Sequence, residues 1–410
     1  MKLLATILSL WWLATAPATA ADTAGSPARQ QEQLRGKLRQ MLGIPSARCD
    51  LAPELRGRLE RDGVVVEKWV WTAEPGSRVP ALLFRPARAD GPLPAIVFTY
   101  GHGGSKSSWS YQYAAQVYAK LGVATLSMDP IGEEERNPKG ATGTRAHDAK
   151  GVSERCDTAG RPIMGKFVFD AMRGLDFLLT RPGIAHDRLG VAGNSLGGAT
   201  AGWVAALDTR LRIALVTGWA FDDVTIPTKL CTRRPNERMR QLCTWAEYAA
   251  LPAPHCAMLL ANGDADVIID RDGTGAAWRG TQAAVNEAAQ VYAALGAPGK
   301  IAAWLEPGGG HRPYFASKVS LEWIHQHLGT PGWTLERIRQ LPTRNAGEWC
   351  DAHSIPLEKL YGTTLHWRGA TLPDFGIRPL SRAELACLRP DELGKPEFTL
   401  DGWLARIERR

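Results

Sequence analysis

A serine between two glycines is the feature of this sequence that most directly indicates chemistry. Residues 193–197 read Gly-Asn-Ser-Leu-Gly, a G-x-S-x-G pattern with Ser195 at its centre. Residues 187–192 before it predict a short buried strand, and the small residues 198–206 after it predict a helix. Glycines let strand and helix meet at so sharp a turn without a Cβ clash, and the serine oxygen stays exposed. We therefore predict that Ser195 is a nucleophile.

A serine hydroxyl is a poor nucleophile near neutral pH unless an imidazole takes its proton and a carboxylate orients that imidazole. The apolar residues 257–262 predict a strand, and the turn after it carries Asp266, which we predict to be the acid. Asp223 is the main alternative, because it follows the predicted strand 211–217.

The base is predicted from a glycine-rich loop. Residues 301–305 predict a strand that runs into Glu-Pro-Gly-Gly-Gly and then His311. His325 and His327 fall on a predicted helix, residues 317–328, where a solvated or capping role is expected. We therefore predict His311 as the base, which gives a triad in the chain order serine, acid, histidine.

Ester or amide chemistry at such a serine also needs backbone N–H groups aimed at the developing oxyanion. One should be the amide of Leu196, directly after the serine. A second should come from residues 100–105, Tyr-Gly-His-Gly-Gly-Ser, after the predicted strand 94–99. Glycine suits this position because backbone without a Cβ can approach a substrate closely. Gly103 is our preferred donor, and its neighbours remain candidates.

These four signals resemble the α/β-hydrolase superfamily, and within it the bacterial secreted acetyl xylan esterases and dienelactone-hydrolase-like esterases. The similarity covers residues 64–328 and includes the predicted strands 64–69 and 79–86. It also includes residues 101–104, Gly-His-Gly-Gly, which we call the H-G-G loop. It implies an α/β fold: a mostly parallel, doubly wound sheet with helices on both faces and the site at the carboxyl ends of the strands.

The resemblance also implies that the loop after Ser127 lies beside the active site, so that Asp129 borders the substrate. For the three glutamates that follow, Glu133, Glu134 and Glu135, we expect a solvated acidic loop.

The domain plan has five parts. Residues 1–20, with a basic start, a short apolar core and an A-x-A ending, predict a signal peptide and therefore a secreted or periplasmic protein. An N-terminal helical extension should occupy 21–63 and the hydrolase domain 64–328. Within that domain, 220–254 is a candidate lid insertion. A C-terminal extension covers 329–410, and its sequence leaves open whether it wraps the core or forms a small module.

Composition excludes several classes of function. The formal net charge is +7, but Lys and Arg are scattered, which argues against nucleic-acid binding. No later segment reaches the roughly 18 uncharged apolar residues of a membrane helix. The chemistry needs no organic cofactor.

Seven cysteines fit an oxidising compartment. Cys256 opens an apolar strand and should be a buried free thiol. The other six cysteines allow 15 full pairings, of which Cys231 with Cys243 and Cys350 with Cys387 are our candidates. No C-x-x-C or Cys/His spacing suggests zinc, so we predict no metal.

The leading hypothesis is a secreted serine carboxylic-ester hydrolase that acts through an acyl-enzyme, on esters linked to carbohydrate. Trp109 and Trp219 are candidates to stack on a sugar, although packing roles are favoured. The alternatives are a serine peptidase of the prolyl-oligopeptidase type and a non-catalytic binding protein on the same scaffold. The peptidase is disfavoured because the segment before residue 94 is too short for a propeller.

Overall fold

A nine-stranded sheet forms the centre of the computed structural model, which describes residues 27–223, 229–357 and 365–409. The predicted signal peptide, residues 1–20, lies outside the described residues. The strand order is β1-β2-β3-β5-β4-β6-β7-β8-β9. The strands are β1 (Glu54–Arg61), β2 (Val64–Glu74), β3 (Ser77–Pro86), β4 (Leu93–Thr99), β5 (Ala124–Met128), β6 (Ile184–Asn194), β7 (Leu211–Thr217), β8 (Ala257–Gly263) and β9 (Ile301–Glu306).

The sheet is parallel from β5 to β9 and antiparallel from β1 to β5. Strands β4 and β8 are buried along their whole length, as expected for strands covered on both faces. The mostly parallel, doubly wound fold predicted from the sequence is therefore confirmed.

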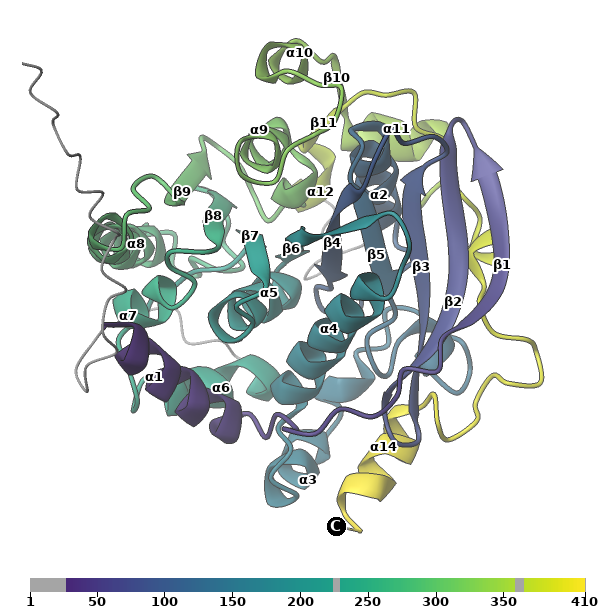
Figure 1. Ribbon diagram of the computed structural model, residues 1–410, viewed down its shortest axis with the longest axis horizontal. Helices are drawn as coiled ribbons and strands as arrows, with labels where there is room; N and C mark the ends of the chain where they lie inside the picture. The colour runs from purple at the N-terminus through teal and green to yellow at the C-terminus, as the bar shows by residue number, and fades with distance from the viewer. Residues whose placement is uncertain (1–26, 224–228, 358–364, 410) are drawn as a thin grey trace, which may run out of the picture.

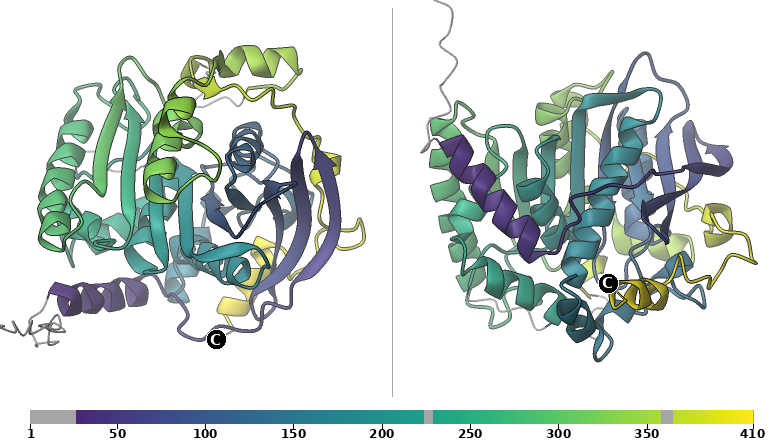
Figure 2. Two further views of the ribbon diagram at one scale, coloured as in Figure 1. Left: turned by 45° about the horizontal axis from the view of Figure 1, so that its top comes forward. Right: turned by 60° about the horizontal axis from the view of Figure 1, so that its bottom comes forward.

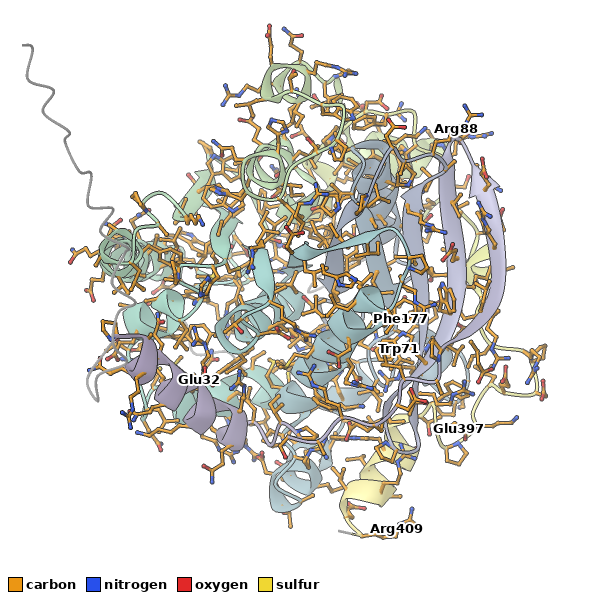
Figure 3. All side chains as sticks on the ribbon, in the orientation of Figure 1. Glu32, Trp71, Arg88, Phe177, Glu397 and Arg409 are labelled. Carbon is orange, nitrogen blue, oxygen red and sulfur yellow. The ribbon has the colours of Figure 1, made fainter. Side chains whose placement is uncertain are left out.

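Helices cover both faces of this sheet (Figures 1 and 2). On one face lie α1 (Pro27–Met41), α3 (Val152–Thr158), α4 (Ile163–Leu179), α5 (Leu196–Leu207), α6 (Leu230–Met239), α7 (Trp245–Ala250), α8 (Ala276–Ala294) and α14 (Leu400–Ile407). On the other lie α2 (Trp109–Lys120), α9 (Lys318–His327) and α11 (Ala346–Ala352). Side chains alternate between two large cores because successive strand residues point to opposite faces. Figure 3 shows one such contact, Trp71 of β2 beside Phe177 of α4, with ring centroids 6.1 Å apart.

The predicted boundary at residue 64 cuts through the sheet. Strand β1 lies in the segment expected to be a helical extension, yet it pairs with β2 along nearly its whole length. Its sequence, Glu-Leu-Arg-Gly-Arg-Leu-Glu-Arg, is mostly charged, which suits an edge strand with one side in water. Charge at an edge hides the apolar alternation by which strands are recognised.

The C-terminal extension wraps the core and forms no separate module. Trp349 of α11 is buried in one core, and Trp403 of α14 is buried in the other. Before α11 lie α10 (Leu335–Arg339) and β10 (Thr343–Asn345), and between α11 and α14 lie α12 (Leu365–Arg368), β11 (Thr371–Pro373) and α13 (Arg382–Leu385). Strands β10 and β11 pair as a small antiparallel sheet. The segment therefore contributes to the stability of both sides of the sheet.

No disulfide joins the cysteines, all of which lie in the described residues. The expected Cys231–Cys243 bridge is wrong because helix α6 separates the two thiols. Cys231 lies in the first turn of α6, and Cys243 packs against Met239 at the other end of the helix. Residues 231 and 239 are about 12 Å apart along the helix axis, so Cys243 lies beyond disulfide reach of Cys231.

The second expected bridge is also absent. Cys350 lies in α11, whereas the thiol of Cys387 contacts the carbonyl of Ala81 on β3 at 3.4 Å. Cys256 is a buried thiol, as predicted.

A buried carboxylate joins the C-terminal helix to the sheet. Glu74 of β2 accepts hydrogen bonds from Lys166 at 2.8 Å, Arg161 at 2.6 Å and the Trp403 indole at 3.2 Å. Burial alone would raise the pKa of Glu74, but Lys166 and Arg161 lower it from 4.5 to about 2. A shift of that size corresponds to about 3 kcal/mol of stabilisation at neutral pH.

We expect Glu74→Gln to lower the free energy of unfolding at pH 7 by about 3 kcal/mol, because the variant leaves buried cations without their carboxylate. Wild-type stability should fall as the pH drops from about 4.5 towards 2, since a depressed carboxyl pKa contributes stability only above the unfolded pKa. Urea unfolding followed by circular dichroism measures both effects. Glu408→Gln, which removes an exposed partner of Arg155, is the control and should leave the midpoint unchanged. Equal losses of unfolding free energy in Glu74→Gln and Glu408→Gln would contradict a special role for the buried network around Glu74.

Candidate functional site

Ser195 lies on the turn between β6 and α5, in a strained backbone conformation with φ 62° and ψ −125°. Its amide donates to the Thr217 carbonyl of β7 at 2.9 Å. A Cβ on Gly193 would lie 2.3 Å from the Thr99 hydroxyl, and one on Gly197 would lie 2.3 Å from the Thr99 carbonyl. Both glycines are therefore required by the close approach of strand β4 to the turn, as the G-x-S-x-G pattern predicted.

Asp266 and His311 meet in the loops after β8 and β9. Nδ1 of His311 lies 2.7 Å from the Asp266 carboxylate, and both side chains are almost fully buried. The other oxygen of Asp266 accepts the amides of Ile268 and Ile269 at 3.0 and 3.3 Å. These bonds fix the carboxylate, so the imidazole is held with its Nε2 directed away from the acid.

The alternative acid, Asp223, is placed elsewhere. Its side chain is 58% exposed and pairs with Arg240 at 2.7 Å and with the Trp245 indole at 2.7 Å. These contacts connect it to the insertion after β7. Asp266, and not Asp223, is the carboxylate that contacts His311.

Ser195 and His311 line one pocket at the carboxyl edge of the sheet. Its walls come from the H-G-G loop, α2, the loop before α3, the insertion and the C-terminal extension. The lining residues are Gly101, His102, Gly104, Ser110, Tyr111, Arg145, Asn194, Ser195, Lys229, His311, Phe315 and Trp367. Parts of the chain that are far apart in sequence therefore line the pocket of the serine.

The amides of the H-G-G loop differ in their availability. The Gly101 N–H donates to the Tyr111 hydroxyl at 2.9 Å, and the Gly104 N–H donates to the Gly101 carbonyl at 2.9 Å. Within the described residues, the amides of His102 and Gly103 have no such partner. Leu196 opens α5, where an N–H has no partner inside the helix. Gly103 and Leu196 thus have amides available to a ligand oxygen.

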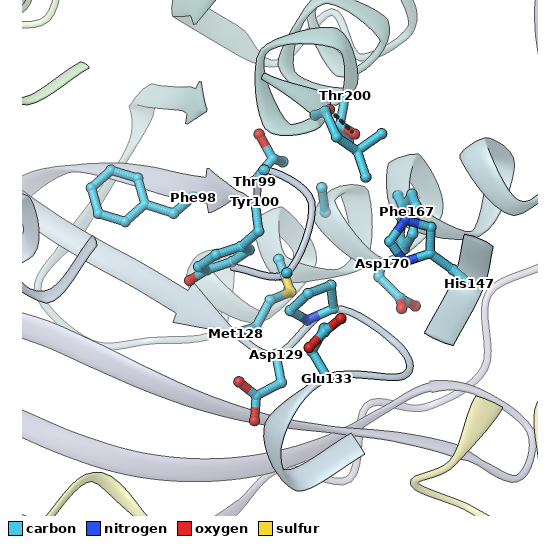
Figure 4. A pocket seen from close by; sticks show the side chains of 15 residues that line it. Phe98, Thr99, Tyr100, Met128, Asp129, Glu133, His147, Phe167, Asp170 and Thr200 are labelled. Atoms are coloured by element: carbon cyan, nitrogen blue, oxygen red, sulfur yellow. Dashed lines mark hydrogen bonds between the residues drawn. The ribbon is translucent and has the colours of Figure 1, made fainter. Parts of the chain in front are cut away.

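A second cavity adjoins this loop (Figure 4). Gly103 and Leu196 line it together with Asp129, Glu133 and His147, and it shares Gly101 with the pocket of Ser195. The two cavities therefore meet at the H-G-G loop.

The acidic loop after β5 is buried, which contradicts the expectation of a solvated loop. Lys106 donates to Asp129 at 2.7 Å and to Glu134 at 2.9 Å, and it lies 2.8 Å from Glu135. All four side chains are buried, and the ammonium group compensates part of the charge of the three carboxylates. Although burial opposes the charge, the carboxylates raise the pKa of Lys106 well above its ordinary value. Burial raises the pKa of Asp129, whereas Lys106 outweighs burial at Glu134 and lowers its pKa to about 2.

Two glutamates of this loop also hold neighbouring segments in place. The Glu133 carboxylate accepts the Thr144 amide at 3.0 Å and the Thr144 hydroxyl at 3.1 Å. The Glu135 carboxylate accepts the amides of Cys387 and Leu388 at 2.9 and 2.7 Å. The loop thus holds both the segment before α3 and the C-terminal extension.

Two histidines lie close together between the pocket and the second cavity. The rings of His102 and His147 stack with centroids 5.4 Å apart. Burial lowers the pKa of His102 to about 3 and that of His147 to about 4, so both rings are neutral at neutral pH.

Several lining residues were missed by sequence reasoning. Arg145, Lys229 and Trp367 lie on loops and on a four-residue helix, with no periodic pattern to place them. Trp109 and Trp219, the candidates for sugar stacking, are both buried in the cores, as favoured.

Comparison with known proteins agrees with this architecture. The acetyl xylan esterase family matches residues 47–220. "Putative hydrolase YtaP" of Bacillus subtilis (strain 168) is 25% identical over 192 residues, which span 44% of this chain and 62% of that relative.

Two solved structures illustrate the likeness in three dimensions. The methylesterase BT1017 has a TM-score of 0.56 at 20% identity, covering 73% of this chain and 63% of its own. A glucuronoyl esterase from Solibacter usitatus has a TM-score of 0.52 at 14% identity, covering 69% of this chain and 88% of its own.

None of the described helices has the length and apolar character needed to cross a membrane. The chain therefore has the α/β-hydrolase fold, and its residues 47–220 resemble the acetyl xylan esterase family.

Proposed function

We propose that this protein is a serine carboxylic-ester hydrolase that acts on esters attached to carbohydrate. The observation that carries the proposal is the 2.7 Å contact between Asp266 and His311, in a pocket that also contains Ser195 on its strained turn. A buried acid that orients a histidine in the same pocket as a partly exposed serine is the arrangement expected of a serine hydrolase.

In this mechanism the Ser195 hydroxyl attacks the ester carbonyl while Nε2 of His311 takes its proton. Asp266 keeps the Nδ1–H directed towards its carboxylate and stabilises the imidazolium. The amides of Leu196 and Gly103 donate to the oxyanion of the tetrahedral intermediate. His311 then returns the proton to the leaving alcohol, which departs and leaves an acyl-enzyme.

Hydrolysis of the acyl-enzyme uses the same groups in the reverse sense. His311 takes a proton from water, the hydroxide attacks the acyl carbonyl, and the proton passes to the Ser195 oxygen as the acid is released. Every proton in both half-reactions therefore moves through His311.

The pocket wall supports a sugar-bearing substrate. Trp367 is mostly buried but contributes an aromatic side chain to the pocket lining, and Arg145 and Lys229 contribute hydrogen-bond donors to it. The family match is to acetyl xylan esterases, and the two structural neighbours described above are named as a methylesterase and a glucuronoyl esterase. An acyl or methyl ester on a polysaccharide is therefore the substrate class that we propose, and we propose export for a protein that meets such polymers outside the cell.

Ser195→Ala should lower the turnover of p-nitrophenyl acetate by at least about 10³-fold, because the acyl-enzyme cannot form. Ser110→Ala, which removes another hydroxyl from the same pocket, is the matched control and should keep most of the activity. Labelling with a fluorophosphonate probe should follow the same pattern. A folded wild-type protein that neither turns over the ester nor reacts with the probe would favour the non-catalytic alternative.

Asp266→Asn should reduce kcat by about 10⁴-fold, since an amide favours the wrong imidazole tautomer. Asp223→Asn should have a small effect, because Asp223 pairs with Arg240 at an exposed position. Steady-state kinetics on one activated ester measure both variants. The reverse ranking would move the acid to the loop after β7.

Substrate class is tested by measuring acid release, or alcohol release, from acetylated xylan, feruloyl esters, glucuronoyl methyl esters and simple alkyl esters. We expect at least one carbohydrate ester to have a higher kcat/KM than the alkyl esters. Trp367→Ala should raise KM for that sugar ester by about tenfold or less, the value of one aromatic contact, and leave small alkyl esters unaffected. A preference for alkyl esters throughout would overturn the carbohydrate proposal and leave the triad proposal intact.

A further inference from the structure

We propose that His102, His147, Asp148 and Cys231 bind one zinc ion. Each of the four side chains offers one ligand atom, and these atoms all lie within 4.8 Å of one another. They come from three separate segments: the H-G-G loop, the short helix η2 (Ala146–Asp148) and the start of α6. This convergence explains why no Cys/His spacing in the sequence indicated a metal.

The distances suit tetrahedral coordination. His102 Nε2 lies 3.3 Å from the Cys231 sulfur and 3.4 Å from the Asp148 carboxylate, and His147 Nε2 lies 3.9 Å from that carboxylate. Bonds of about 2.0–2.1 Å to nitrogen or oxygen and about 2.3 Å to sulfur place tetrahedral ligand atoms roughly 3.3–3.6 Å apart. The four side chains therefore need only small movements to close around an ion.

Unsatisfied polar atoms are the independent observation that points to a ligand here. His147 is 2% exposed, and both of its ring nitrogens lack a hydrogen-bond partner among the described residues. Asp148 Oδ2 is also buried without one. Burying such atoms unpaired costs free energy, so native structures rarely tolerate three of them in one cluster. A cation bound by a His147 nitrogen and by Asp148 would satisfy two of these atoms at once.

The chemistry of the donors favours zinc over harder ions. Two neutral imidazoles, a carboxylate and a thiolate form a mixed nitrogen, oxygen and sulfur set, which suits zinc better than magnesium or calcium. The two anionic ligands would neutralise the charge of a divalent ion. Lys229, with Nζ 3.7 Å from Asp148, and Arg145 on the neighbouring loop are the cations that face the cluster.

A site with four protein ligands is closed, which is typical of structural zinc. The site has a consequence for the pocket. His102 directly precedes Gly103, and α6 lies within the insertion, directly after Lys229. Zinc would therefore fix the H-G-G loop to the insertion. This inference does not depend on the proposed esterase activity, since metal binding is measured directly.

The test is to strip the full chain of metal, add zinc chloride, remove the excess and measure bound zinc by elemental mass spectrometry. Wild type should retain about one zinc ion per chain, as four ligands form one site. Cys231→Ser and His147→Ala should each lower retention at least tenfold. Cys243→Ser is the matched control, because this buried thiol lies beyond the other end of α6 and outside the cluster, and it should bind zinc like wild type.

Cobalt substitution of the wild-type protein tests ligation without any variant. Cobalt bound at these residues should give a thiolate-to-metal charge-transfer band and the intense visible bands of tetrahedral geometry. Absence of the thiolate band, or zinc retention that persists in folded Cys231→Ser, would overturn the proposal. Equal loss of zinc in Cys243→Ser would also overturn it, because the binding would then not be specific to the cluster.

Discussion

A single buried ammonium group organises the surroundings of the pocket. Lys106 follows the H-G-G loop and is fully buried, so its charge requires carboxylates that are equally buried. Asp129, Glu134 and Glu135 meet this requirement and thereby fold the chain after β5 back under the loop. Because one uncompensated charge inside the protein is far more costly than a lost surface ion pair, this part of the structure has little freedom to rearrange.

The remaining parts of the pocket depend on that folded-back loop. Through Glu133 and Glu135 it holds the segment before α3, which carries Arg145, and the C-terminal extension, which carries Trp367. The strained conformation of Ser195 is supported from the other side by the close approach of β4, β6 and β7. Strain of this kind persists only where the surrounding structure over-determines it. A rigid frame on both sides of the serine is therefore part of how the site is built.

The regular core of this fold was largely predictable, and the pocket wall was not. Strands such as β4 and β8 are continuous apolar runs between turn residues, so their positions and the loops after them follow from the sequence. The meeting of Asp266 with His311 could be anticipated because parallel strands end at one edge of a sheet.

Other features of the structure left no local pattern in the sequence from which they could be predicted. Strand β1 is mostly charged, and the glutamates after β5 have the composition of a solvated loop, although the distant Lys106 makes their burial favourable. Trp367 reaches the pocket only because a segment without periodic pattern crosses the fold. The part of the chain that matches the acetyl xylan esterase family, residues 47–220, includes Ser195 and the H-G-G loop, but Asp266, His311 and Trp367 all lie beyond it. The family match thus covers the part of the pocket that includes Ser195 and ends before the parts that include His311 and Trp367, so the two ends of the chain meet in one pocket although the family describes only one of them.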